Sequence, residues 1–190
     1  ALRRALEKAL ERSSGEVAVA VDARRLALLR LGDGDARQWC EAAIARSGTM
    51  LDTGIGRVPE LFGRWRIDGA ADLLVGWAGR AELPPLVRSS AARGLCWLRD
   101  PRGLQLAQAL LAEKELDLHA PAVVEAMQLV QRTLVEFVDD LSRPDACGIQ
   151  LGDANKAAES ARQWRRWFEA HGAPRWRAPS EDTEDARCWY

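Results

Sequence analysis

The sequence predicts an all-α protein, arranged as a right-handed α-solenoid of stacked helical hairpins. Apolar residues recur mostly at intervals of three and four, the spacing that places side chains on one face of a helix. Almost no stretch alternates at period two, so little of the chain favours a sheet. Short turns rich in Gly, Pro and Asp separate the helical segments, and the unit of two helices recurs along the chain.

Composition excludes several classes of protein. The chain has 190 residues, of which 47% are hydrophobic and 29% charged, enough apolar material for one globular domain or one continuous array. No run is long and apolar enough to span a bilayer. The 27 basic residues nearly balance the 28 acidic ones, leaving a net charge of -1. Nucleic acid is therefore a disfavoured partner, because phosphate binding usually needs a basic excess.

The first part of the chain predicts three helices. Residues 2–10 carry one leucine stripe on a helix that should end near the following Ser-Ser-Gly. Residues 17–31 are predicted as a second helix, although the opening VAVAV alone could form a strand because β-branched residues favour strands. Asp35 is a suitable N-cap for a third helix ending at Gly48. The stretch TMLDTGIGRVPE, residues 49–60, then interrupts the helical pattern.

Proline and aspartate mark the remaining helix starts, since proline suits the first turn and aspartate caps free N–H groups. The predicted starts are Pro59, Asp68, Pro84–Pro85, Asp100–Pro101 and Pro121. The helix from Pro121 is the longest and carries an apolar stripe that ends at Phe137. After a loop over 143–152, Asp153 or Asn155 caps a last helix that closes at residues 171–172.

These elements predict a single helical repeat domain over residues 1–178. Residues 1–60 form divergent N-terminal helices, 61–140 the clearest repeats and 153–172 a capping helix. Residues 179–190 are a polar, acidic tail that we expect to be mobile. Each hairpin has too much apolar surface to stand alone, so neighbouring hairpins should stack and bury it.

One segment carries a family resemblance. Residues 83–111, LPPLVRSSAARGLCWLRDPRGLQLAQALL, resemble a HEAT repeat of the short bacterial type. The V-R-x-x-A-A-x-x-L core of that repeat is matched over residues 87–95, and its D-P turn by Asp100–Pro101. Residues 101–138 match more loosely, residues 1–60 hardly match, and residues 161–176 are similar to the Trp-rich helix that closes such arrays. The resemblance implies an α-solenoid that binds another macromolecule across its concave face, with tetratricopeptide-like packing as the nearest rival.

No catalytic, cofactor or metal signature is recognisable. The sequence contains no GxSxG, HExxH, Walker A or GxGxxG motif, and both histidines, His119 and His171, lie at helix ends where local structure explains them. The acidic pairs lack the ligand spacing of a calcium loop. Four scattered cysteines have no CxxC spacing, and Cys40 and Cys96 lie beside tryptophans within helical patterns. We therefore expect reduced, buried thiols, a cytoplasmic location, no cofactor and no metal.

Charged side chains predict a groove on the concave face. Glu125, Gln128, Arg132 and Glu136 share a polar stripe on the longest helix, and two arginines share a face of the preceding repeat's second helix. The groove candidates are Arg88, Arg99, Glu125, Gln128, Arg132 and Glu136. Their mixed charge suits a protein better than a polyanion, and an ordinary solvated face is the competing interpretation.

A second candidate surface lies near the C-terminus. Tryptophans alternate there with arginines, and these two residue types are enriched at binding hot spots and stack on nucleobases. The candidates are Trp164, Arg165, Trp167 and Trp176. A capping helix with its own cation–π contacts explains the same pattern. Trp39, Trp65, Trp77 and Trp97 are instead predicted to belong to the core.

The combined pattern predicts a non-enzymatic adaptor that binds another protein. Two alternatives from other classes are a DNA-binding HEAT-like glycosylase for alkylated bases and a cofactor-handling repeat protein of the bilin lyase kind. The near-balanced charge and the presence of only three lysines, at 8, 114 and 156, weigh against the glycosylase. The chain begins at Ala1 without methionine, which indicates processing or a longer precursor. No feature of the sequence defines an oligomeric state.

Overall fold

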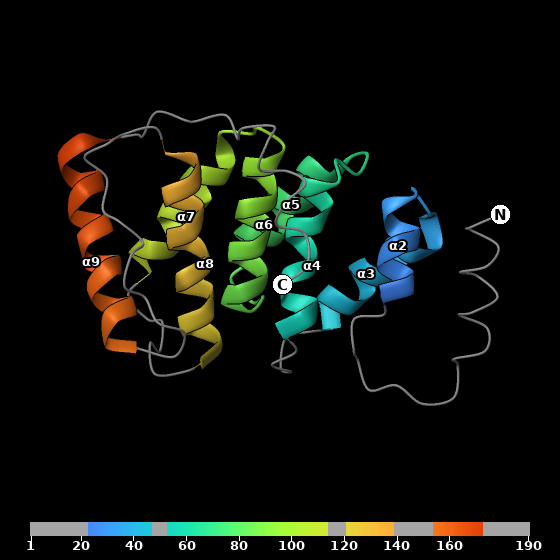
Figure 1. Cartoon of the computed structure of the whole chain (residues 1–190), viewed down its shortest axis with the longest axis horizontal. Helices are drawn as coiled ribbons and strands as arrows, with labels where there is room; N and C mark the ends of the chain where they lie inside the picture. The colour runs from blue at the N-terminus through green and yellow to red at the C-terminus, as the bar shows by residue number, and fades with distance from the viewer. Residues whose placement is uncertain (1–22, 47–52, 114–120, 139–153, 173–190) are drawn as a thin grey trace.

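The computed structural model describes residues 23–46, 53–113, 121–138 and 154–172, and every regular element in these ranges is an α-helix (Figure 1). The helices are α2 (Ala23–Arg30), α3 (Gly34–Arg46), α4 (Thr53–Arg64), α5 (Ala70–Gly79), α6 (Pro85–Trp97), α7 (Arg102–Ala112), α8 (Pro121–Phe137) and α9 (Ala154–His171). The all-α prediction is confirmed for this part of the chain. None of its helices is long and apolar enough to cross a membrane.

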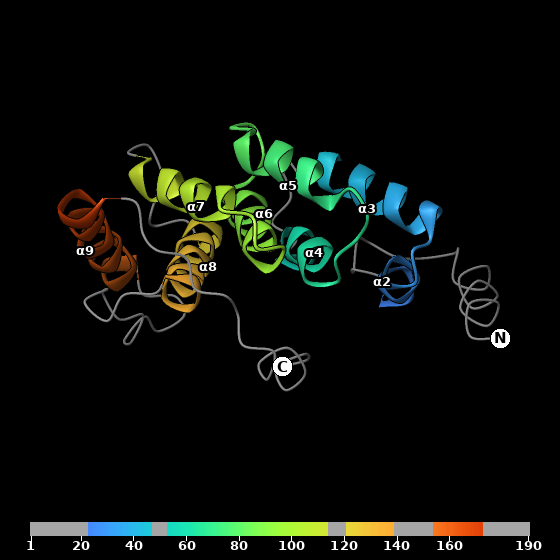
Figure 2. The same ribbon diagram turned by 90° about the horizontal axis from the view of Figure 1, so that it is seen from above.

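The helices lie in two rows (Figure 2). α3, α5 and α7 form one row, and α2, α4, α6 and α8 form the other. Successive members of the second row, α4, α6 and α8, pack directly on one another, while α5 and α7 pack across them. α9 closes the C-terminal end against α7 and α8. The chain therefore alternates between the rows from α2 to α8, as a series of helical hairpins does.

Helix α6 lies at the centre of the array and is buried on nearly every side. It packs against α4, α5, α7 and α8. Its residues divide among three core clusters. Val87, Ala91 and Leu95 belong to the cluster that includes α2–α5, Cys96 and Trp97 belong to the cluster that includes α7–α9, and Leu86 packs with two residues of α8. Each cluster joins neighbouring hairpins, so apolar burial is shared along the array as it is in solenoid proteins.

Glycines let α4 and α6 approach until their backbones touch. A Cβ atom on Gly63 would lie 1.9 Å from the carbonyl oxygen of Gly94, and a Cβ atom on Gly94 would lie 2.8 Å from that of Pro59. Any side chain at these positions would push the two helices apart. A parallel close approach joins α6 to α7, where a Cβ on Gly103 would lie 2.7 Å from the oxygen of Ala92.

The predicted start of α4 at Pro59 is wrong. The helix begins at Thr53, so Pro59 lies inside it. Proline removes one helical N–H donor, and the next N–H, that of Glu60, donates to Ser90 Oγ on α6 at 2.9 Å. Glycine and proline have low helix propensity, which is why residues 49–60 were predicted to interrupt the helices. Packing of Ile55, Val58 and Phe62 into the core outweighs that low propensity.

Two predicted N-caps are also wrong. Asp33, rather than Asp35, caps α3: its Oδ1 accepts a hydrogen bond from the N–H of Ala36 at 2.9 Å. Asp68 does not cap α5, which is preceded by Gly69 in a left-handed conformation without a side-chain cap bond. The carbonyl oxygen of Asp68 instead accepts a hydrogen bond from Arg37 of α3 at 2.7 Å.

Three further boundaries follow the predictions, whereas Asn155, one candidate cap of the last helix, lies inside α9, and the other candidate, Asp153, lies outside the described residues. α6 and α8 begin at Pro85 and Pro121, and α9 ends at His171. The first predicted helix, the VAVAV segment, the loop over 143–152 and the tail over 179–190 lie outside the described residues. The predicted reduced thiols are present at Cys40 and Cys96, which are buried, and burial raises the pKa of each thiol to about 12.

We expect Gly63→Ala to lower the free energy of unfolding by about 1–3 kcal/mol, because the added methyl group would overlap the Gly94 backbone. Gly76→Ala on α5 is the matched control, since a Cβ there meets no atom within 4 Å. It should raise stability by about 0.5–1 kcal/mol through helix propensity. Urea unfolding monitored by circular dichroism measures both changes. Equal effects of the two variants would contradict the close approach.

Candidate binding edge

The C-terminal ends of α2, α4 and α6 share one turn geometry. Gly32, Arg66 and Arg99 each follow one of these helices with a positive φ, at 77°, 52° and 62°. In every case the next residue's N–H donates back to a carbonyl five residues earlier, as from Ile67 to Phe62 at 3.0 Å and from Asp100 to Leu95 at 2.9 Å. This is a Schellman turn, and it recurs roughly every 33 residues, within the range of two-helix repeats.

At the C-terminal ends of α2, α4 and α6, an arginine of one helix lies over the tryptophan ring at the end of the next helix in the row. The Arg30 guanidinium lies 5.9 Å from the ring centroid of Trp65, and one repeat later Arg64 lies 5.4 Å from that of Trp97. Both distances fall within the range of cation–π attraction. Leu31, at the end of α2, is the large hydrophobic residue that stands out as exposed in the described ranges, at 51%. We call this surface the C-terminal edge; it comprises Arg30, Leu31, Arg64, Trp65, Arg66, Leu98 and Arg99.

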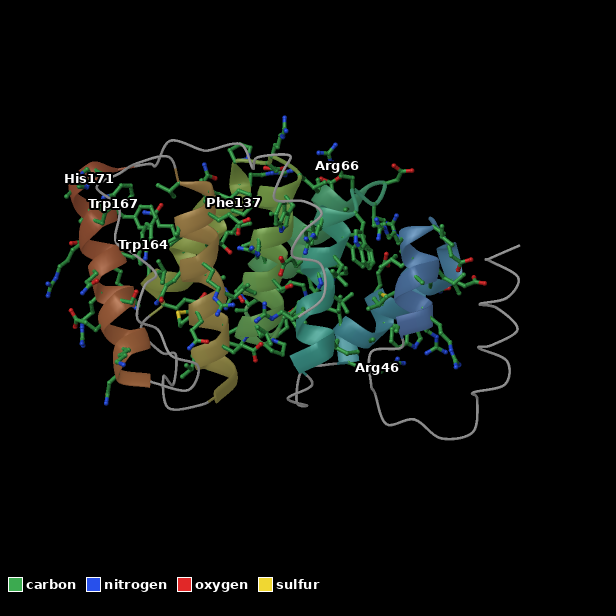
Figure 3. The ribbon with its side chains drawn as sticks, viewed as in Figure 1. Arg46, Arg66, Phe137, Trp164, Trp167 and His171 are labelled. Atoms are coloured by element: carbon green, nitrogen blue, oxygen red, sulfur yellow. The ribbon has the colours of Figure 1, made fainter. Side chains whose placement is uncertain are left out.

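A pocket of about 390 Å³ lies on the C-terminal edge, between the ends of α4 and α6. Its lining residues are Arg66, Trp97, Leu98 and Arg99, and we call it the arginine pocket. Both arginines are exposed. Figure 3 shows Arg66 at the upper end of α4, on the edge of the array opposite to that of Arg46. The pocket therefore combines two cations with one aromatic and one aliphatic side chain.

A buried ion network lies directly beneath the arginine pocket. Arg93 of α6 pairs with Glu60 of α4 at 2.7 Å and with Glu136 of α8, so one cation joins three helices. Glu60 also accepts a hydrogen bond from Trp97 Nε1 at 3.3 Å. Burial alone would lower the pKa of Arg93, but the two carboxylates outweigh burial and raise it above its usual value. We call this set the Arg93 network.

The Arg93 network fixes the indole of Trp97 at the base of the pocket. The Arg93 guanidinium lies 5.7 Å from the Trp97 ring and 5.8 Å from that of Phe137. Trp97 and Phe137 meet edge to face, with centroids 5.3 Å apart. Since the indole N–H is directed to Glu60, its polar atom is already satisfied.

The structure does not bring the six groove candidates together. Glu125 pairs with Arg57 of α4 at 3.0 Å, and Glu136 belongs to the Arg93 network. Gln128 is buried, whereas Arg132 is exposed. Arg99 lies on the C-terminal edge. The acidic members of the predicted groove thus neutralise arginines of neighbouring helices.

Arg88 lies on the other side of α6. Its guanidinium forms a two-bond ion pair with Glu113, at the end of α7, and donates to the carbonyl oxygen of Ala78 at 3.2 Å. Arg165 of α9 reaches the same end of α7 and donates to the carbonyl oxygen of Leu111. These two arginines join α5, α6, α7 and α9, and they bind carbonyl groups that a helix leaves unsatisfied at its C-terminus.

The predicted C-terminal patch lies mostly in the core. Trp164 is fully buried and Trp167 nearly so, and both contact Phe168. Trp167 stacks on His171, whose Nδ1 lies 2.9 Å from the Trp167 carbonyl oxygen. Trp176 is outside the described residues. Of the tryptophans that the sequence assigned to the core, Trp77 and Trp97 are buried as predicted, and Trp39 and Trp65 are partly buried against it. Arginines lie over the rings of Trp39, Trp65 and Trp97.

The described residues form no group of His, Cys, Asp and Glu side chains that would hold a metal ion. Cys40 and Cys96 are buried thiols whose raised pKa values keep them protonated near neutral pH. Arginine and tryptophan supply bidentate hydrogen bonds and a large rigid contact surface, which are the properties of binding hot spots.

Sequence reasoning missed the C-terminal edge because its arginines are far apart in the chain. One signal was available: Trp65-Arg66 and Trp97-Leu98-Arg99 each follow a helix end, where glycine is the usual residue. Alignment of the three helix ends on Gly32 would have shown an arginine replacing glycine twice.

Comparison of the chain with known protein families, with curated proteins and with solved structures gave no significant match.

We expect Arg93→Ala to lower the free energy of unfolding by about 3–5 kcal/mol, because it leaves two carboxylates without their shared cation. Arg57→Ala is the control, since it also removes an arginine that pairs with α8. The Arg57 side chain is 37% exposed against 12% for Arg93, so its loss should cost less than about 1 kcal/mol. Chemical unfolding distinguishes the two; similar costs would contradict a buried network.

We expect Arg66→Gly and Arg99→Gly each to stabilise the fold by about 1 kcal/mol. Both residues hold a left-handed conformation. This conformation is strained for any residue with a Cβ atom but not for glycine, which occupies the equivalent turn at Gly32. Thermal unfolding of each variant measures the change. A lower midpoint would show that these side chains contribute more to folding than their conformation costs.

Proposed function

We propose that this protein is a non-catalytic helical-repeat module that binds a partner protein through the C-terminal edge. The observation that supports this most is the arginine pocket, in which two exposed arginines flank a tryptophan at positions where the repeat geometry favours glycine. Residues other than glycine persist at such strained positions when they serve a function. Arginine and tryptophan are also the side chains that dominate the binding energy of protein interfaces.

The surroundings of the pocket fit a protein interface. Leu31 and the aromatic ring of Trp65 lie along the same edge, so apolar contacts accompany the arginines. Interfaces of this composition have an apolar, aromatic centre within a charged rim. The net charge of -1 favours a protein over a nucleic acid as the partner.

The architecture that we propose is a right-handed solenoid of the HEAT-like kind. Its support is the V-R-x-x-A-A-x-x-L motif, which spans the central helix α6, together with the recurrence of one turn geometry at three helix ends. Binding is proposed at the C-terminal edge rather than in the concave groove, because the groove carboxylates Glu125 and Glu136 already pair with arginines of this chain. Buried, reduced cysteines fit a cytoplasmic location.

Affinity purification from native lysate tests this function. The tagged wild-type chain is compared with an Arg66→Glu/Arg99→Glu double variant and with an Arg46→Glu control. Arg46 is exposed like the pocket arginines but lies on the opposite edge of the array (Figure 3). We expect one or a few proteins to bind the wild-type chain and the control, and to be lost from the double variant.

Equal retention by all three proteins would refute binding at the C-terminal edge. Recovery of nucleic acid instead of protein, measured by absorbance and nuclease digestion, would favour the glycosylase alternative. Circular dichroism confirms that the variants are folded, which separates loss of the partner from loss of structure.

A further inference from the structure

We propose that the arginine pocket binds a carboxylate side chain of an acidic peptide segment; this rests on the proposed function and names the chemistry of the partner. Guanidinium groups match carboxylates because two parallel N–H donors meet two oxygen acceptors. Arg66 and Arg99 come from successive repeats and line one cavity, so a single anionic group can reach both. Trp97 and Leu98 supply an apolar floor that limits the access of water to such a pair.

Two carboxylates close to the pocket, those of Asp100 and Glu60, are held by arginines outside it. Asp100 follows Arg99 directly, but its oxygens accept hydrogen bonds from Arg102 at 2.6–3.0 Å. These hydrogen bonds hold the pKa of Asp100 below its usual value. Glu60 is held by Arg93 beneath the Trp97 ring. Arg99 forms no ion pair with any residue that the structure describes, so its charge is available to a ligand.

Backbone conformation supports a ligand-binding role independently of charge. Arg66 and Arg99 both hold left-handed φ angles, whereas the equivalent turn after α2 uses Gly32. A left-handed conformation costs an arginine free energy, and neither side chain fills the core, since both are exposed. Two occurrences at adjacent repeats, converging on one cavity, indicate that the side chains are retained for what they bind.

The arrangement favours an acidic peptide over a nucleic acid. A nucleic acid presents regularly spaced phosphates and requires cations that continue along its path. Here the next equivalent turn has Gly32 beside the exposed Leu31, and the other two arginines of the edge, Arg30 and Arg64, lie over tryptophan rings. A cationic pocket next to an apolar side chain matches a segment in which Asp or Glu is followed by an apolar residue. Such a segment gains a charge-assisted hydrogen bond and apolar burial together.

A peptide-display experiment with the full chain tests this proposal. A library of random peptides is selected on the immobilised protein, and an enriched peptide is then labelled with fluorescein for anisotropy titration. We expect enrichment of Asp or Glu beside apolar residues, and a Kd that rises with ionic strength. In an Arg66→Gly/Arg99→Gly variant the Kd should rise at least about tenfold, because both charge-assisted contacts are lost. An Arg46→Gly control should leave the Kd unchanged.

The glycine variant separates binding from folding, because it should bind less tightly while unfolding at a midpoint no lower than that of the wild-type chain. Enriched peptides without acidic residues that still lose affinity in this variant would overturn the acidic ligand and leave the edge as the interface. Equal affinity for wild type and variant, or no enrichment, would overturn both the acidic ligand and binding at the C-terminal edge. Tighter binding of an oligothymidine probe than of the acidic peptide would assign the pocket to phosphate.

Discussion

Backbone contact between α4 and α6 is the constraint on which the rest of the structure depends. No side chain fits at position 63 of α4 or at position 94 of α6, so the two helices pack with their backbones in contact. That approach brings the end of α4 beside the end of α6, and it brings Glu60 within reach of Arg93. Both the buried ion pair and the pocket above it follow from the absence of two Cβ atoms.

The buried charges determine how the inner row is aligned. Arg93 connects α4, α6 and α8 through carboxylates on either side, so sliding any one of these helices along its neighbour would break an ion pair in a poorly solvated site. Apolar packing alone tolerates such shifts far better, since hydrophobic contacts are not directional. The network thus specifies register, and the same register places Arg64 over the ring of Trp97.

The sequence predicted the helices well where local signals and core packing agree. Pro85 and Pro121 begin their helices as expected, because proline fits a first turn in any tertiary context. Pro59 misled the prediction because the hydroxyl of Ser90, distant in the chain, accepts the N–H of Glu60 and makes an internal proline tolerable. Periodicity placed Glu136 on a polar stripe, but only the fold shows that Arg93 neutralises it.

The candidate site was less accessible to sequence reasoning than the fold. Tryptophan and arginine were recognised as binding residues, yet adjacency in the chain pointed to Trp164 and Trp167, which the structure places in the core. Arg66 and Arg99 become neighbours only when two hairpins stack. Contacts between repeats depend on how helices pack, and no local pattern encodes them.

The recurring Schellman turn also has a consequence for the evolution of this surface. The turns after α2, α4 and α6 each place one residue with a positive φ at the edge of the core. Mutation there alters surface chemistry at a small and uniform cost in stability, without disturbing the packing of neighbouring helices. Duplication of a hairpin would add another such residue to the edge. The array can therefore change the chemistry of this edge one repeat at a time, while its interior stays the same.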